Sequence, residues 1–136
     1  MKHSKSDLAS LIIRASLGTI LLSHGLLKLL IFTPAGTVAF FESLGLPSII
    51  AYLTISGEVA LGVALILGIL TRISAALSLP ILFGASWVHA SNGWLFSNQG
   101  GGWEFPVLLI VLAVSVIVRG NDDFNIKTVL KNGLTL

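Results

Sequence analysis

The chain has 136 residues, of which 54% are hydrophobic and only 10% carry charge, whereas about 25% of the residues of soluble domains are charged. The mean hydropathy is +0.96 and apolar runs recur along the whole chain, which excludes a soluble globular protein and predicts a polytopic membrane protein. The absence of cysteine excludes disulfides, thiol exchange and cysteine-ligated iron-sulfur clusters. The eight basic residues are scattered, so nucleic acid is not an expected partner.

The first apolar run covers residues 8–32 and follows two lysines. It is longer than the roughly 7–15 residues of a signal-peptide apolar region, so it predicts a membrane-spanning helix. Pro34, Gly36 and the Leu-Gly-Leu-Pro sequence at 44–47 predict a loop after it.

Three further spans are predicted, at 48–70, 73–90 and 104–118. Thr71 and Arg72 are expected to form a tight turn, and 91–103 is a polar, glycine-rich loop. Small residues at four-residue spacing, Ala60, Ala64 and Gly68, are typical of membrane helices that approach closely. We therefore expect an all-α membrane protein, an antiparallel bundle of four transmembrane helices over residues 1–120. A polar cytoplasmic tail over 121–136, which could form a surface helix, is expected to follow.

The distribution of basic residues predicts the orientation of this bundle. Loops 33–47 and 91–103 contain no lysine or arginine, whereas the opposite side carries Lys2, Lys5, Arg72, Arg119, Lys127 and Lys131. The positive-inside rule then places both termini in the cytoplasm. Three tryptophans fall near the outer side, where indole rings favour the headgroup layer: Trp87, Trp94 and Trp103.

Six ionisable residues lie within or beside the apolar runs: Arg14, His24, Lys28, Glu58, His89 and Glu104. A charge at the centre of a spanning helix costs roughly 2.5–3.5 kcal/mol on insertion scales, so such residues are candidates for ligand binding or proton relay. His24 and Lys28 are one helical turn apart, and Arg14 lies on the same face. At about 1.5 Å per residue, four of the six share one layer in the outer half: His24, Glu58, His89 and Glu104.

A structural alternative is that these charges only fix packing, with Arg14 paired to Glu58, Lys28 paired to Glu104 and the histidines donating to carbonyl oxygens. The two histidines could also ligate a haem, but the neighbouring Lys and Glu side chains suit a polar, hydrogen-bonding ligand better. No metal site is predicted. The polar loop, with Asn92, Asn98 and the glycines at 100–102, could fold over the mouth of the bundle or be a flexible turn.

A series of short motifs follows in a fixed order across the four apolar runs: Arg14, Leu17-Gly18, His24-Gly25, Lys28, Leu44-Gly45, Pro47, Glu58, Gly62, the Leu-Gly-Ile-Leu-Thr-Arg sequence at 67–72, His89, Asn92-Gly93 and the Gly-Gly-Trp-Glu sequence at 101–104. No single motif is specific, but in this ordered combination the sequence resembles the DoxX family. The resemblance covers Arg14 to Gly120.

This resemblance implies a small protein of a bacterial inner membrane. It also implies redox chemistry at that membrane, because members of the family are associated with quinone handling, thiosulfate oxidation and oxidative stress. A quinone headgroup could receive hydrogen bonds from His24, Lys28 and His89, while Glu58 and Glu104 relay protons. Lacking cysteine, a dinucleotide-binding glycine motif and an evident flavin site, the chain would need a bound cofactor or a redox partner protein. It would then be a subunit of a quinone-linked oxidoreductase.

The alternative function is a small transporter or a lipid- or solute-binding membrane protein, which could use the same charges as a proton-coupled site. An isolated four-span bundle is small for a transporter, so that alternative favours a homodimer.

Overall fold

The computed structural model describes residues 4–122 and 124–133, and this part of the chain is helical with no strand. The elements are α1 (Lys5–Leu26), η1 (Leu27–Ile31), α2 (Thr33–Ser43), α3 (Ser48–Leu67), α4 (Thr71–His89), η2 (Ala90–Asn92), α5 (Glu104–Arg119) and α6 (Ile126–Gly133). Three stretches are long and apolar enough to cross a membrane: Lys5–Ile31, Ser48–Leu67 and Thr71–Asn92. The fold is therefore that of an all-helical membrane protein.

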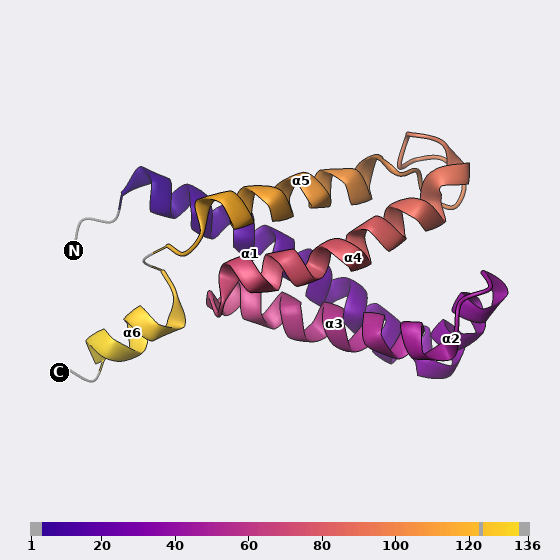
Figure 1. The fold of residues 1–136 in the computed structure, drawn as a ribbon, viewed down its shortest axis with the longest axis horizontal. Coiled ribbons are helices and arrows are strands. Elements are labelled where there is room, and N and C mark those ends of the chain that lie inside the picture. Colours follow the sequence, from indigo (N-terminus) through magenta and orange to yellow (C-terminus); the bar gives the residue numbers. More distant parts are fainter. Residues whose placement is uncertain (1–3, 123, 134–136) are drawn as a thin grey trace.

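The four long helices, α1, α3, α4 and α5, form a ring in which each packs against two neighbours. Helix α1 packs against α3 and α5, and α4 packs against the same two helices. Apolar side chains from all four meet in one core: Leu17, Leu21, Leu65, Ala75, Leu82, Leu109, Ala113 and Val116. The start of α1 and helix α6 lie at one end of the molecule, and α2 lies at the other (Figure 1).

Glycine allows the closest approach in the bundle, between α1 and α3. A Cβ atom added at Gly18 would lie 2.7 Å from the carbonyl oxygen of Gly62, and one added at Gly62 would lie 2.6 Å from the backbone nitrogen of Leu22. Our expectation that Ala60, Ala64 and Gly68 form the packing stripe was wrong, because Ala60 is exposed. In a bilayer, small residues such as these glycines let two backbones touch where bulkier side chains would hold them apart.

Two connections differ from the sequence-based prediction. The predicted loop at 33–47 contains the 11-residue helix α2, because Pro34 occupies a first-turn position where its missing N–H is not needed. Thr71 and Arg72 are not a turn but the first residues of α4. The turn before them uses left-handed backbone at Gly68 and Leu70, with φ of 70° and 44°.

The segment after α5 is not a free tail. Thr71 Oγ1 donates a hydrogen bond to the side chain of Asn121, and Asp122 is 4% exposed. Helix α6 follows at Ile126, with Val129 and Leu130 exposed. Residues 121–122 thus close one end of the helix bundle before α6 begins.

Candidate functional site

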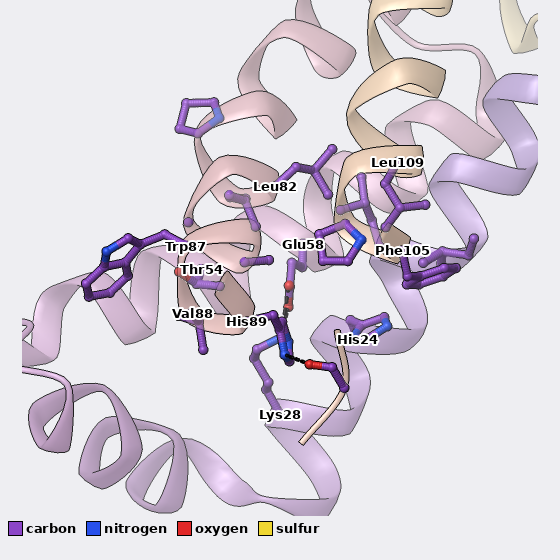
Figure 2. A pocket seen from close by; sticks show the side chains of 18 of the residues that line it. His24, Lys28, Thr54, Glu58, Leu82, Trp87, Val88, His89, Phe105 and Leu109 are labelled. Atoms are coloured by element: carbon purple, nitrogen blue, oxygen red, sulfur yellow. Dashed lines mark hydrogen bonds and ion pairs between the residues drawn. The ribbon is translucent and has the colours of Figure 1, made fainter. Parts of the chain in front are cut away.

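A cavity of about 400 Å³ lies in the half of the molecule that includes α2. Residues from α1, η1, α2, α3, α4 and α5 line it, together with the loop between α4 and α5. Its walls are largely apolar, with aromatic side chains from Phe40, Phe41, Trp87, Phe96 and Phe105. Its polar side chains are His24, Lys28, Thr54, Glu58 and His89, several of which are labelled in Figure 2. This combination of volume, apolar wall and few polar groups is typical of small-molecule sites.

Four of the six ionisable candidates line this cavity: His24, Lys28, Glu58 and His89, here called the cavity cluster. The close packing of α1 on α3 brings the first three together. A Cβ atom added at Gly25 would lie 2.9 Å from the backbone nitrogen of Val59 and 3.0 Å from Cβ of Glu58. Gly25 therefore sets how closely His24 and Lys28 approach Glu58.

Lys28 and Glu58 form an ion pair across the α1–α3 interface. Lys28 Nζ donates to both carboxylate oxygens of Glu58, at 2.9 and 2.8 Å, and the two side chains extend toward each other in Figure 2. The Lys28 and Glu58 side chains are 19% and 7% exposed. Lys28 lies in the π-helical turn η1, a local widening that often marks functional sites. The carbonyl of Lys28 accepts a hydrogen bond from Thr37 Oγ1, at 3.3 Å.

His89, the last residue of α4, connects the cavity to the loop 93–103, here called the lid loop. Its Nδ1 lies 3.0 Å from the carbonyl oxygen of Gly100 and 3.1 Å from that of Gly101. Asn92 Nδ2 donates to the same two oxygens. The lid loop thus folds over the cavity, and Phe96, Gly101 and Gly102 line it.

Internal contacts order the lid loop, so it is not the flexible turn of the alternative prediction. The rings of Trp94 and Trp103 pack edge to face with centroids 4.4 Å apart. The Glu104 carboxylate accepts a hydrogen bond from the backbone N–H of Phe96 at 2.8 Å. Glu104 therefore holds the loop and does not line the cavity.

Arg14 lies away from the cavity, near the start of α6. It pairs with Asp122, with Nε 2.7 Å from one carboxylate oxygen and Nη2 3.1 Å from the other. Its remaining N–H groups donate to the carbonyl oxygens of Leu65, Ile66 and Phe124. Arg14 thereby caps the end of α3, whose last carbonyls have no partner within the helix.

The ion pairs of the structural alternative were wrong in both cases. Arg14 pairs with Asp122 instead of Glu58, and Lys28 pairs with Glu58 instead of Glu104. The sequence-based argument missed Asp122 because it treated 121–136 as a solvated tail. A buried arginine needs a charged partner. This requirement could have directed the search to an acidic residue outside the spans.

Comparisons with known proteins identify the family of this chain. The sequence pattern of the DoxX family matches residues 9–91. This stretch includes Arg14 and all four members of the cavity cluster. The chain belongs to the DoxX family. It is also 31% identical over 115 residues to a Bacillus subtilis (strain 168) protein named "Putative oxidoreductase CatD", covering 85% of this chain and 81% of the relative. No solved structure gives a significant match.

Proposed function

We propose that this DoxX-family protein is a quinone-linked subunit of a membrane redox system, and that its cavity binds a quinone-like headgroup. One observation carries the proposal. Four ionisable side chains from α1, η1, α3 and α4 converge on an apolar, aromatic cavity of about 400 Å³ inside a membrane protein. An ionisable side chain within a spanning helix is costly and rare. The convergence of four such side chains on one cavity therefore favours a polar ligand.

The cavity's chemistry fits a planar ring with polar oxygens. Aromatic walls such as Phe41 and Phe105 can pack against a ring face. Lys28 Nζ uses two of its three hydrogens on Glu58 and retains one for a ligand oxygen. Thr54 adds a hydroxyl, which itself donates to the carbonyl of Ile50.

Several cavity-lining side chains also face outward, which supports entry from the bilayer. Phe40 is 51% exposed, Ile50 38% and Trp87 58%, and all three line the cavity. These residues lie on α2, α3 and α4 in the half that contains the predicted outer loops. A lipid-soluble molecule could reach the polar groups here without crossing water.

The proposal includes four spans with both termini in the cytoplasm of a bacterium, in its inner membrane. Helix α5 has 16 residues, or about 24 Å at 1.5 Å per residue, and the lid loop lengthens its path through the interface. Its outward side chains Leu108, Val111 and Val118 are apolar and exposed, as lipid contact requires. A reporter fusion at the C-terminus should be active only on the cytoplasmic side; periplasmic activity would contradict this topology.

Electrons would come from a partner protein or a bound cofactor, since the sequence has no cysteine. The redox role of the chain's own residues is then to hold the headgroup and to carry protons. The name of the Bacillus subtilis relative supports an oxidoreductase system.

The test is binding of a decyl-substituted 1,4-benzoquinone to the full-length protein in lipid nanodiscs. Quenching of tryptophan fluorescence measures the binding. Trp87 lines the cavity and serves as reporter. Gly84 also lines it, and a Cβ added there meets no atom within 4 Å. Gly84→Leu should therefore fill the cavity without a clash and weaken binding at least about tenfold.

Gly36→Ala is the matched control, because Gly36 does not line the cavity and the nearest atom to an added Cβ is 3.5 Å away. It should bind like the unmodified protein. Unchanged binding by Gly84→Leu would overturn the assignment of the cavity. A phospholipid that co-purifies and is not displaced by the quinone would instead favour the lipid-binding alternative.

A further inference from the structure

The contacts of His89 determine which ring nitrogen carries its proton. Nδ1 lies within hydrogen-bond distance of two carbonyl oxygens, those of Gly100 and Gly101, at 3.0 and 3.1 Å. Carbonyl oxygens only accept hydrogen bonds, so Nδ1 is the donor. A neutral imidazole has one N–H, and Nε2 of His89 therefore presents a lone pair.

The Nε2 atom of His89 is accessible and has no partner among the described residues. Nε2 makes no hydrogen bond to the described part of the protein. Within that part, no fully buried side-chain nitrogen lacks a partner, so an unpartnered Nε2 must be accessible. His89 lines the cavity, so Nε2 is an unused acceptor on a cavity-lining side chain.

The cavity cluster consequently offers two kinds of partner. Lys28 supplies a positively charged donor, held by the Glu58 carboxylate at 2.9 and 2.8 Å. His89 supplies an acceptor, held by the lid loop. A ligand with carbonyl oxygens at both ends of its ring would place an oxygen lone pair against the lone pair of Nε2, and two acceptors cannot form a hydrogen bond. A ring that bears a hydroxyl would donate to Nε2 instead.

We propose that His89 Nε2 accepts a hydrogen bond from a ligand hydroxyl, so that the cavity selects the hydroquinone form over the quinone. The inference rests on the proposed function and adds to it the form of the ligand that binds best. The oxygen on the opposite side of the ring accepts a hydrogen bond from the third N–H of Lys28. The selectivity arises from the lid loop, because its two carbonyls fix the imidazole tautomer.

The experiment compares three probes of similar shape on the full-length protein in nanodiscs under argon, by isothermal titration calorimetry. The probes are the decyl-substituted 1,4-benzoquinone, its hydroquinone and the hydroquinone dimethyl ether, which has no O–H. The hydroquinone should bind about tenfold more tightly than either other probe, the value of one good hydrogen bond. Equal binding of all three would overturn the inference and leave the proposed function standing, whereas no binding of any probe would overturn both.

Two variants separate selectivity from folding. His89→Asn keeps a side-chain N–H near the position of Nδ1, but its one acceptor, the amide oxygen, then lies near the position of Cδ2. No acceptor remains at the position of Nε2, so the hydroquinone should lose its advantage over the other two probes. Asn92→Ala removes donors to Gly100 and Gly101 without changing Nε2, and it should weaken all probes alike while preserving their order. A preference retained by His89→Asn would contradict the assignment.

A measurement without any ligand tests the same assignment. Nitrogen-15 chemical shifts of the His89 ring in solid-state NMR distinguish protonated from unprotonated nitrogens. The structure requires a protonated Nδ1 and an unprotonated Nε2. The reverse pattern, or a doubly protonated ring at neutral pH, would overturn the proposal.

Discussion

The two ends of the helix bundle both bury charged side chains, but they leave different hydrogen-bonding capacity unused. Near the start of α6, Arg14 is 1% exposed and all five of its N–H groups have protein acceptors. In the cavity cluster, Lys28 retains one N–H and His89 retains an acceptor. A satisfied buried charge can act as a structural connection, whereas unused donors and acceptors beside a cavity are what a ligand needs.

The largest expected loss of stability is at the end of the bundle where Arg14 is buried. Arg14→Leu leaves the Asp122 carboxylate buried without its partner, and breaking a buried pair lowers the free energy of unfolding by about 3–5 kcal/mol. Thermal unfolding in detergent, followed by tryptophan fluorescence, measures the loss. Arg14→Leu with Asp122→Leu removes the unpaired carboxylate and should recover that part of the loss. It should not recover the part due to the carbonyl oxygens of Leu65, Ile66 and Phe124, which lose their donors in both variants. A double variant no more stable than Arg14→Leu would contradict a pairwise role.

The next effect lies at the contact that positions the cavity cluster. Gly25→Ala places a Cβ 2.9 Å from the backbone nitrogen of Val59, so α1 and α3 must separate. Overpacking of this kind costs about 1–3 kcal/mol, and we expect quinone binding to weaken as well, since Lys28 moves away from Glu58. The same substitution at Gly36, where the nearest atom is 3.5 Å away, should change neither quantity.

Glu58→Gln tests the cavity cluster directly. The amide keeps the shape of the carboxylate but removes its charge, leaving the Lys28 ammonium with a weaker partner. We expect about tenfold weaker quinone binding, or about 1.4 kcal/mol, in a protein that still inserts into the membrane. Binding of the decyl quinone in nanodiscs measures this change. Normal binding together with a large loss of stability would instead indicate a purely structural ion pair.

The smallest effect is expected at Arg119, which pairs with Asp7 at 2.7 Å and is 43% exposed. Solvent-exposed pairs contribute about 0–1 kcal/mol, so Arg119→Gln should barely change thermal unfolding in detergent. A loss as large as that of Arg14→Leu would remove the contrast between buried and exposed pairs in this protein.

The sequence by itself determined the class of protein and the residues to examine. Low charge and recurring apolar runs require a bilayer, and the exceptions to that apolarity singled out Glu58, Lys28 and the two histidines. Helical spacing and depth also placed His24, Glu58, His89 and Glu104 in one layer; the first three line the cavity, whereas Glu104 holds the lid loop. The layer could be predicted because it depends on the fixed rise of an α-helix, but the direction in which each side chain points could not.

Only the tertiary structure decided which charges are partners. Helix rotation and the close approach at Gly25 selected Glu58 for Lys28, and the path of the chain after α5 brought Asp122 to Arg14, 108 positions away. The tautomer of His89 depends on the fold of the lid loop. Pairing across such separations is fixed by packing in three dimensions, because spacing along a chain specifies the face of one helix and not the neighbour that it meets.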